Sequence, residues 1–245
     1  AKLVIFSETF LAGYPSWSWK LTAGGDTAGG DDDRALGNAI HAQLQANSVD
    51  LSANDLQPIQ DAAAKLGVVV GMGLNEIDKA YSGSTLYNTY VIIGDDGRIL
   101  NRHRKLIPTN VERMVWGCGD ASGLRVVDTP YGRIGSLICW ENYMPLSRFA
   151  LYSQAIDIYL APTWDSGDGW LASMRHIATE GRCWVLSSAT AIKGSDVPLD
   201  FLGRDRLFDD DTWVNPGDAV VVAPGGEIVA GPLHKKSDIL YAEID

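Results

Sequence analysis

Short apolar runs, separated by polar turns and by longer amphipathic stretches, recur along the whole chain. Runs enriched in β-branched and aromatic residues predict strands at Leu3–Phe6, Val68–Met72, Tyr90–Ile93, Ile134–Ile138, Ile156–Leu160 and Trp184–Ser187. Turn sequences at residues 95–97 (Asp-Asp-Gly) and 224–226 (Pro-Gly-Gly), each between two apolar runs, predict two β-hairpins. Because a hairpin makes neighbouring strands antiparallel, we expect mixed sheets rather than a barrel of parallel strands.

Helical spacing of apolar residues is clearest in the segment Leu56–Leu66. Asn54 or Asp55 precedes this segment with a side chain suited to capping the first free N–H groups of a helix. Gly67 follows the segment, at the position where a glycine ends a helix in the left-handed conformation. We therefore expect an amphipathic helix with a capped start and a glycine stop.

Two further segments show helical spacing. Trp170–Arg182 places its apolar residues on one face, and Asp33–Gln45 is a third helix candidate, preceded by a Gly/Asp-rich loop at Gly24–Asp33. Strands and helices thus alternate, which predicts an α/β fold. The polar stretch Lys193–Asp211 is expected to be a loop. Since neither loop is long and uniform enough to be a linker, we expect residues 1–245 to form a single domain.

Composition and charge narrow the classes of partner. The 245 residues carry a net charge of −11 at pH 7, which disfavours a surface for nucleic-acid phosphates. Three cysteines at wide spacing do not form a disulfide framework, so a reducing, cytoplasmic compartment is the simplest expectation. No apolar run reaches the length of a membrane span and no signal peptide opens the chain, so we expect no membrane partner.

The segment Gly132–Pro145 contains the most informative cysteine. An apolar strand-like run leads into Cys139, and a predicted helix opens at Pro145, so the cysteine lies in a turn between strand and helix. Such a turn holds a side chain clear of the sheet and near helix-terminal N–H groups, which favour an anion. A thiol in that position is a candidate thiolate nucleophile. Taken alone, a cysteine in a strand-rich region is more often an inert core residue.

Three other ionisable residues stand at the ends of predicted strands. Glu8 follows the first strand, Lys105 follows the second strand of a hairpin, and Glu112 lies seven residues after Lys105. Taken separately, Glu8 is typical of a helix start or a surface acid, and Lys105 of a solvated charge. Their combination with Cys139, in this order along the chain, is what carries a functional prediction.

Three stretches surround Glu8, Lys105 and Cys139: Phe6–Pro15, His103–Thr109 and Leu137–Pro145. They resemble the motifs that carry the catalytic Glu, Lys and Cys of the nitrilase superfamily of carbon–nitrogen hydrolases. Met174–Cys183 and Asn215–Asp218 also occur in the expected order, so the resemblance spans nearly the whole chain. The Cys-Trp-Glu sequence is similar to that of the true nitrilase branch. The fold that the resemblance implies is a four-layer αββα sandwich with mixed sheets.

The resemblance also implies a role for each residue. Cys139 would attack the substrate carbon, Glu8 would be the general base, and Lys105 would stabilise the anion that develops. The Trp140 backbone N–H would assist Lys105, and Glu112 would orient Lys105 and help proton transfer. Because a nitrile carbon is a modest electrophile, a largely ionised thiolate is expected. The reaction would pass through a thioimidate and a thioester to a carboxylic acid and ammonia.

Substrate-binding residues are expected beside the nucleophile. The resemblance points to Tyr14, Trp116, Thr163, Trp164 and Asp165, and the chain contains eight tryptophans, several beside the motifs, which fits an aromatic-walled pocket. A core position is the alternative for each tryptophan. The chemistry needs no cofactor or metal, and the four histidines are widely scattered. The sequence leaves open whether the nitrile is aliphatic, arylaceto- or aromatic.

Rival functions remain open. A relative could use the same Glu-Lys-Cys chemistry on amides, on carbamoylated amines or on cyanide. A non-catalytic assembly protein with this fold is a more distant alternative, although a scaffold would need none of the four side chains. The family's usual first strand and helix and its C-terminal tail have no counterpart here, so we expect the sequence to be part of a longer chain. The resemblance further implies a homodimer and allows higher spiral oligomers.

Overall fold

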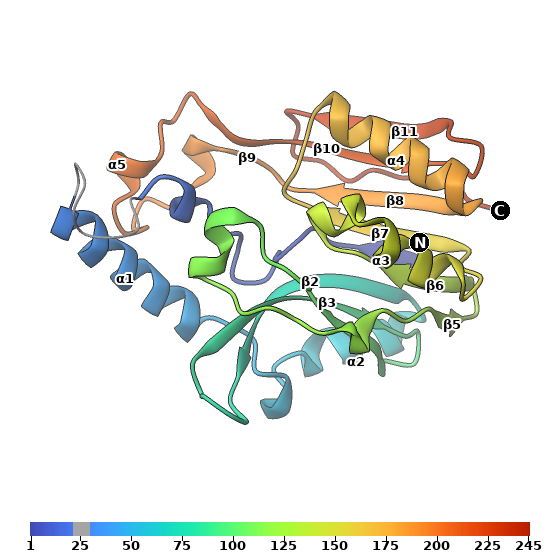
Figure 1. The fold of residues 1–245 in the computed structure, drawn as a ribbon, viewed down its shortest axis with the longest axis horizontal. Coiled ribbons are helices and arrows are strands. Elements are labelled where there is room, and N and C mark those ends of the chain that lie inside the picture. Colours follow the sequence, from blue (N-terminus) through green and yellow to red (C-terminus); the bar gives the residue numbers. More distant parts are fainter. Residues whose placement is uncertain (22–29) are drawn as a thin grey trace.

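Two β-sheets form the centre of the molecule (Figure 1), and the computed structural model describes residues 1–21 and 30–245. The first sheet has the order β1-β2-β3-β4, with strands at Leu3–Ile5, Val69–Asp78, Thr85–Ile93 and Ile99–Arg104. The second has the order β11-β10-β8-β7-β6-β5. From β5 to β11, omitting β9, its strands are Val127–Thr129, Gly132–Ser136, Ile158–Thr163, Trp184–Ala189, Trp213–Val222 and Ile228–His234. A short β9 (Ala191–Lys193) pairs with β10 outside this order.

Helices cover the outer side of each sheet. On the side of the first sheet lie α1 (Gly30–Ala46) and α2 (Gln57–Leu66), and on the side of the second lie α3 (Pro145–Tyr152) and α4 (Asp168–Gly181) (Figure 1). A single helical turn, α5 (Arg204–Leu207), occurs in one connection. The connections also contain short 3-10 helices, which are η1 (Ser16–Trp19), η2 (Leu51–Ala53), η3 (Asn110–Met114), η4 (Ala121–Gly123), η5 (Cys139–Tyr143) and η6 (Gly194–Asp196). The expected four-layer αββα sandwich is confirmed.

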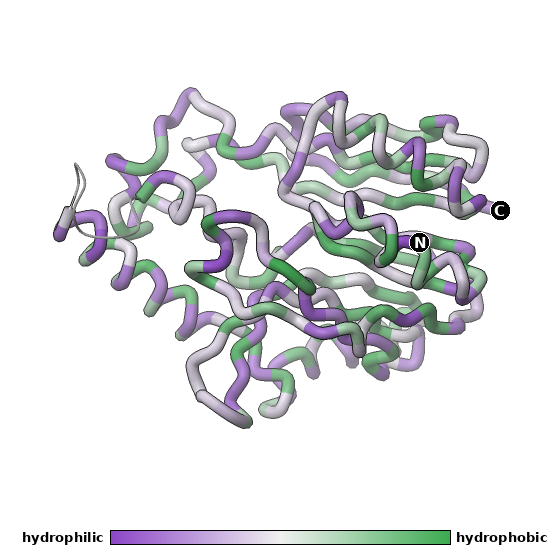
Figure 2. Tube along the Cα trace, in the orientation of Figure 1, coloured by the Kyte–Doolittle hydropathy of each residue, from purple (hydrophilic) through white to green (hydrophobic). Residues whose placement is uncertain are grey.

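Buried apolar side chains hold the four layers together. Between the sheets, residues of β2 and β3 meet residues of β6 and β7, namely Val69, Tyr90, Ile92, Ile134, Ile158 and Leu160. On the outer faces, Leu56 and Ala63 anchor α2 to the first sheet, and Trp170 and Met174 anchor α4 to the second. Figure 2 shows hydrophobic positions running along the strands, whereas α1 alternates between hydrophobic and hydrophilic positions. Burying a side chain of this size contributes about 1.5–3 kcal/mol relative to leaving it exposed.

The strand pairing is mixed, as predicted. The strands β6, β7 and β8 are parallel, whereas β2, β3 and β4 pair antiparallel, as do β10 and β11. Both predicted hairpins are present, and each turn is closed by a glycine N–H: Gly97 donates to Gly94 at 2.9 Å, and Gly226 donates to Ala223 at 2.8 Å. Gly97 and Gly226 have φ values of +82° and +84°, which explains the choice of glycine.

The helix predicted at Leu56–Leu66 is confirmed, but its expected cap is wrong. Leu56 is the N-cap residue and no side chain caps the helix. Asn54 instead ends the preceding η2 turn in a left-handed conformation, and that turn is capped by Asp50. The glycine stop is present, because Gly67 has φ +60° and its N–H returns to the last turn of the helix.

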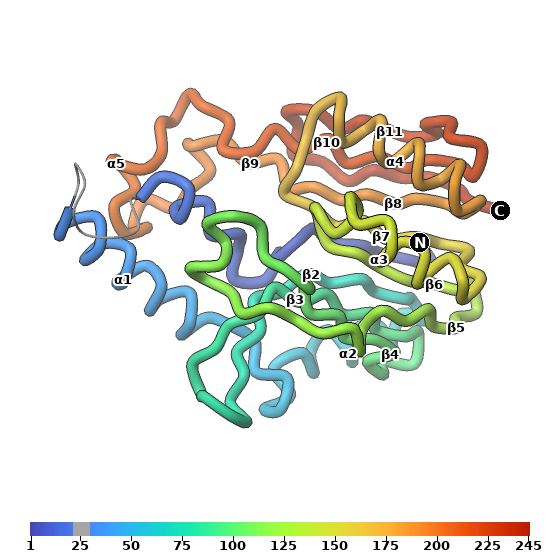
Figure 3. Tube along the Cα trace, viewed as in Figure 1, coloured from blue at the N-terminus to red at the C-terminus, as the bar shows by residue number. Residues whose placement is uncertain are grey.

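Two expected loops differ from the structure. Residues 24–29 of the predicted Gly/Asp-rich loop lie outside the described residues, but residues 30–33 form the first turn of α1, where three aspartates favour the positive end of the helix dipole. The stretch Lys193–Asp211 contains η6 and α5 rather than only loop. It leaves the second sheet and approaches α1 (Figure 3), where its Val197 and Phe208 join a buried cluster with Ile40.

Strand β2 extends six residues beyond the predicted end at Met72. The apolar pattern does not predict this extension, because the extension contains polar residues. These residues can be buried because they pair with side chains from distant segments. Glu76 accepts hydrogen bonds from Arg102 Nε at 2.9 Å and from Thr89 Oγ1 at 2.8 Å, and it also pairs with Arg104. Across residues 1–21 and 30–245, no helix has both the length and the apolar character needed to cross a membrane.

Candidate active site

Cys139 lies at a sharp turn where β6 leads into the short helix η5. Its φ is +51°, in the left-handed region that costs a residue with a side chain about 1–2 kcal/mol. Asn142 holds this turn, because its Nδ2 donates to the backbone oxygens of Leu137 at 3.1 Å and Cys139 at 2.7 Å. The predicted strand–turn–helix geometry is confirmed, and α3 begins at Pro145 as expected.

The ammonium group of Lys105 is buried between two carboxylates. Lys105 Nζ lies 2.8 Å from Glu8 Oε1 and 2.8 Å from Glu112 Oε2, and all three side chains are at most 2% exposed. Glu8 follows β1, Lys105 follows β4, and Glu112 belongs to η3, so three separate elements bring these charges together. Because a buried charge is stable only when it is paired, removing either carboxylate would disturb the whole cluster.

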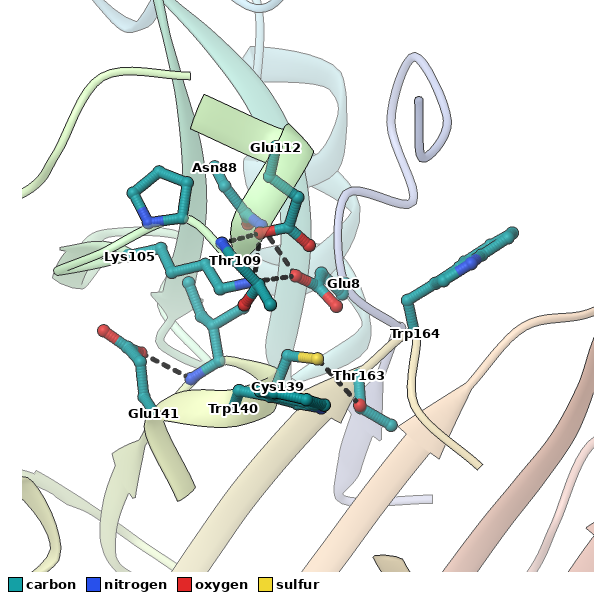
Figure 4. A network of polar contacts seen from close by, with 12 residues as sticks. Glu8, Asn88, Lys105, Thr109, Glu112, Cys139, Trp140, Glu141, Thr163 and Trp164 are labelled. Carbon is teal, nitrogen blue, oxygen red and sulfur yellow. Dashed lines mark hydrogen bonds and ion pairs between the residues drawn. The ribbon is translucent and has the colours of Figure 1, made fainter. Parts of the chain in front are cut away.

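One oxygen of Glu8 remains available on the side of the cysteine. Oε1 accepts hydrogen bonds from Lys105 and from Asn88 Nδ2, the latter at 2.7 Å. Oε2 is buried and has no hydrogen-bond partner among the described residues. Figure 4 shows the Glu8 carboxylate and the sulfur of Cys139 pointing toward the same space. A base that accepts a proton from the thiol needs an oxygen placed in this way.

Burial and neighbouring charges shift the acid–base properties of this cluster. Burial raises the pKa of the Cys139 thiol, and Glu8 raises it further, although Lys105 opposes the rise. Burial also raises the pKa of the Glu8 carboxyl, where Lys105 lowers it and Glu112 raises it. Burial lowers the pKa of Lys105, but Glu8, Cys139 and Glu112 outweigh burial and raise it overall, so Lys105 stays an ammonium. The raised pKa favours the protonated thiol, so a base has to take its proton as the sulfur attacks.

Glu141 joins the cysteine turn to the lysine segment, and we did not select it from the sequence. It is fully buried, and its carboxylate accepts the backbone N–H of Ile138 at 2.7 Å and that of Leu106 at 2.7 Å. Its third partner is His103 Nε2 at 2.8 Å. Ile138 precedes the cysteine and Leu106 follows the lysine, so one side chain fixes both segments. The Cys-Trp-Glu sequence contains this residue, but sequence spacing does not reveal which backbone groups its carboxylate meets.

Asn88 is a second residue that sequence reasoning missed. It lies in β3, is 1% exposed, and donates to Glu8 as described above. No motif surrounds it, because a single polar residue within a strand does not reveal which distant side chain it meets. Its hydrogen bond favours the charged form of Glu8 and lowers the pKa of that carboxyl.

Thr163 and Asp165, both expected near the substrate, are found beside the nucleophile. Thr163 Oγ1 donates to Cys139 Sγ at 3.3 Å and accepts the Asp165 backbone N–H at 2.8 Å. Asp165 Oδ2 accepts from Trp140 Nε1 at 2.9 Å and thereby fixes an indole that is half exposed. Trp140 is the second residue of η5, so its backbone N–H is among the first groups of a helix, which have no partner within the helix.

The three expected aromatic residues have different positions. Tyr14 stacks on Trp164, with ring centroids 4.3 Å apart and an interplanar angle of 6°, and its hydroxyl donates to Glu112 Oε1 at 2.6 Å. Trp116 meets Tyr14 edge-on but is a core residue, 3% exposed, whose Nε1 donates to Asn75 at 2.8 Å. Trp116 therefore packs against Tyr14 from the core side.

The other two cysteines lie outside this cluster. Cys118 is exposed, and Cys183 is buried in the core between α4 and the second sheet, where burial raises the pKa of its thiol to about 12. All three cysteines are free thiols. Across the described parts of the chain, no three His, Cys, Asp or Glu side chains are grouped so that they could hold a metal ion.

Comparisons with known proteins extend these observations. The profile of the carbon–nitrogen hydrolase family matches residues 1–245. The chain belongs to this family. It is 38% identical to a bifunctional nitrilase/nitrile hydratase of Lupinus angustifolius, covering 100% of this chain and 68% of that protein. It is also 38% identical to an aliphatic nitrilase of Sinorhizobium fredii, of which it covers 76%, and to nitrilase 2 of Arabidopsis thaliana, of which it covers 70%; both matches span 100% of this chain. These similarities place it in the nitrilase branch.

Solved structures agree on the fold. A carbon–nitrogen hydrolase of Helicobacter pylori superposes with a TM-score of 0.68 and 20% identity, covering 99% of this carbon–nitrogen hydrolase and 76% of that chain. Nit3 of Saccharomyces cerevisiae, a member of branch 10 of the nitrilase superfamily, gives a TM-score of 0.68 at 20% identity, covering 100% of this chain and 77% of its own. At that identity the likeness supports the architecture, and substrate choice has to be argued from the site itself.

Proposed function

We propose that this protein is a nitrilase, which converts an organic nitrile and two waters to a carboxylic acid and ammonia. The observation that carries the proposal is the buried Lys105 ammonium held between Glu8 and Glu112, with the Cys139 thiol facing the free oxygen of Glu8. The similar proteins named nitrilases support the substrate class. Neither a binding protein nor a scaffold requires this arrangement.

The first step forms a bond between the sulfur and the nitrile carbon. Glu8 takes the thiol proton as Cys139 attacks, and the proton passes to the nitrile nitrogen, which gives a neutral thioimidate. The Lys105 ammonium and the Trp140 N–H stabilise the negative charge while it develops on nitrogen. A single donor of this kind is worth roughly 10²–10³ in rate. Glu112 holds Lys105 in place through its 2.8 Å contact.

Two waters complete the reaction. Glu8 activates the first water, which adds to the thioimidate carbon, and the carbon–nitrogen bond then breaks to release ammonia and leave a thioester. A second water, activated in the same way, adds to the thioester, and breaking the carbon–sulfur bond releases the acid and restores the thiol. If the first tetrahedral intermediate loses sulfur instead of ammonia, the product is an amide.

Amide release is a second candidate activity, favoured by one observation. Some relatives that match the whole chain at 37–39% identity bear the name bifunctional nitrilase/nitrile hydratase. The partition between acid and amide depends on whether sulfur or nitrogen leaves first, so both products have to be measured. Amidase, carbamoylase and cyanide-hydrolysing activities use the same side chains and remain alternatives.

The test measures ammonia, acid and amide release from aliphatic, arylaceto- and aromatic nitriles, from the matching amides, from a carbamoylated amine and from cyanide. Cys139→Ala should abolish release from nitriles while folding and assembly persist, and Cys118→Ala, which changes an exposed thiol, is the matched control. Activity confined to amides, carbamoylated amines or cyanide would assign the protein to another branch. If the folded protein releases no product from any of these substrates, the hypothesis of a non-catalytic assembly protein is favoured.

The proposal also covers the domain organisation, the cellular compartment and the oligomeric state of the protein. We infer a single domain in a reducing, cytoplasmic compartment, supported by the apolar core that joins both sheets and by the three free thiols. We infer a homodimer from apolar residues that α3 exposes, since Leu146 and Phe149 are 83% and 65% exposed. Higher spiral oligomers would need further surfaces.

A further inference from the structure

A cavity of about 550 Å³ adjoins the candidate active site. Glu8, Tyr14 and Trp164 belong both to the wall of this cavity and to the surroundings of the nucleophile. Its volume falls within the roughly 300–1,000 Å³ typical of small-molecule sites. A substrate whose nitrile carbon meets Cys139 beside Glu8 can therefore extend its remaining atoms into this space.

Four segments that are distant in the sequence contribute to the wall. They are the loop after β1, α1, Trp164 after β7, and the stretch of residues 190–214 that leaves the second sheet to meet α1 (Figure 3). Apolar side chains dominate, and they include Trp17, Ile40, Leu44, Ile192, Val197, Phe201, Phe208 and Val214. Phe201 and Phe208 meet edge-to-face, with ring centroids 5.6 Å apart, which is the geometry in which further aromatic rings also pack favourably.

Charge is nearly absent from this wall. Of the described residues that line the cavity, only Glu8 is charged, and it is already committed to Lys105 and to the nucleophile. Lys20 Nζ lies over the Phe208 ring, but this ammonium donates to the Leu207 carbonyl and Lys20 does not line the cavity. Among the described lining residues, a substrate arm that carries a carboxylate would lose water without gaining a cationic partner, and one that carries an ammonium would gain no anionic partner beyond the committed Glu8.

We propose that this cavity selects neutral nitriles that carry an aryl group, whose ring is buried among Ile192, Phe201, Phe208 and Val214. The proposal rests on the proposed nitrilase function and deepens it by naming the substrate class. Cyanide and short alkyl nitriles would leave most of the cavity filled with water and would forgo its apolar contacts. The ring instead supplies binding energy at a site remote from the reacting carbon.

The test compares three nitriles that share a chain length. Hydrocinnamonitrile places a neutral phenyl ring on the far carbon of propionitrile, and the cyanopropanoate anion places a carboxylate there. We expect kcat/KM for hydrocinnamonitrile to exceed the other two values by roughly 10- to 100-fold, since burying a ring of this size is worth that factor. Equal or higher kcat/KM for propionitrile or cyanopropanoate would overturn the proposal while leaving nitrilase activity in place.

The second experiment fills the cavity with a larger side chain. Val214→Trp places an indole in the space proposed for the ring, and Val229→Trp makes the same exchange on β11 outside the cavity wall. Val214→Trp should reduce the preference for hydrocinnamonitrile over propionitrile at least 10-fold, whereas Val229→Trp should keep it. If circular dichroism shows that Val214→Trp is unfolded, Ile192→Phe replaces it. A preference unchanged in the folded variant would count against the cavity.

A binding measurement separates this proposal from the proposed function. Hydrocinnamonitrile is titrated calorimetrically into Cys139→Ala, alone and combined with Val214→Trp, or with Ile192→Phe if that variant has replaced it. Saturable binding that the cavity-filling exchange weakens at least 10-fold supports the cavity even if no nitrile is hydrolysed. Absence of binding to folded Cys139→Ala overturns it. If hydrocinnamonitrile binds but no nitrile is hydrolysed, the nitrilase assignment is refuted and the cavity proposal is not.

Discussion

At the scale of single residues, the candidate site depends on how one cation and two carboxylates share a buried space. Burial and the Glu112 carboxylate raise the pKa of Glu8, while the Lys105 ammonium lowers it. Glu8 can act as a base only when it is ionised, so its activity is lost as the pH falls through this raised pKa. We therefore expect the acid limb of the kcat/KM profile to lie above the ordinary glutamate value of 4.5.

Changing Glu112 to Gln tests that electrostatic balance. The exchange removes a negative charge that raises the pKa of Glu8, and it leaves the positive charge of Lys105 to act on Glu8 alone. We expect the acid limb of kcat/KM to move to lower pH, together with a loss of roughly 10²-fold or more in kcat because Lys105 is no longer held. Asp96→Asn, at an exposed hairpin turn, is the control for a lost carboxylate. An unmoved or raised acid limb would contradict the assignment.

The sequence predicts Glu8, Lys105 and Cys139 because each stands within a contiguous motif, and it predicts Glu112 from the family resemblance. It does not predict Asn88, since the partner of an isolated polar residue in a strand is set by strand register. It also does not predict the raised pKa of the Cys139 thiol, because the burial that raises it arises only after distant segments assemble. The resemblance predicts Trp116 in the pocket, but its side chain is buried in the core.

At the scale of elements, Glu141 fastens η5 to the segment after β4. Its carboxylate accepts one N–H from each side, and each oxygen is needed as an acceptor. Glu141→Gln replaces one acceptor with a donor that faces an N–H group, which leaves a buried group unpaired at a cost of about 1–3 kcal/mol. We expect kcat to fall about 10²-fold with a smaller change in KM, because the nucleophile and the cation lose their mutual alignment.

The matched control for this change is Glu180→Gln on α4, where the carboxylate is partly exposed and pairs with Arg148. Tm and the kinetics are measured for both variants. Normal kcat in folded Glu141→Gln would show that the two segments keep their alignment without it. A lowered Tm with unchanged kinetics would assign Glu141 to stability alone.

Close contact between β2 and the loop that carries Glu8 gives a second element-scale prediction. A Cβ added at Gly73 would lie 2.1 Å from the Ser7 carbonyl oxygen and 2.6 Å from the Thr9 nitrogen. Gly73→Ala must therefore displace the backbone around Glu8, at about 1–3 kcal/mol. We expect Tm to fall by about 2–4 °C per kcal/mol and kcat to fall as well. Gly169→Ala, where nothing lies within 4 Å, should leave both unchanged.

The sequence predicts strands and helices best where the buried positions are apolar and the exposed positions are polar. The apolar runs identify β1, β6, β7 and β8, but β2 continues through Asn75, Glu76 and Asp78, which are buried by partners that sequence spacing does not reveal. The stretch 193–211 was expected to be a loop because it is polar. Its few apolar residues nevertheless form part of the cavity wall, and only the packing of that stretch against α1 brings them there.

At the scale of the whole molecule, the proposed homodimer concerns the outer face of the second sheet. Leu146 and Phe149 of α3 are exposed, and exposed apolar groups of this kind mark contact surfaces. Combining Leu146→Asp with Phe149→Asp should convert a dimer to a monomer in light scattering with size-exclusion chromatography. Leu199→Asp, at a residue 88% exposed on another part of the surface, should not. A monomeric wild-type protein would refute the dimer outright.

The burial of Cys139 also bears on how this protein responds to oxidants. Peroxide oxidises thiolates far more readily than thiols, and it must reach the sulfur to do so. The exposed Cys118 is therefore the sulfur first within reach of oxidants, and its oxidation leaves the reacting centre intact. In the proposed mechanism the sulfur of Cys139 bonds to the substrate carbon as it loses its proton, so turnover offers peroxide no free thiolate. We therefore expect oxidants to modify Cys118 before they abolish activity.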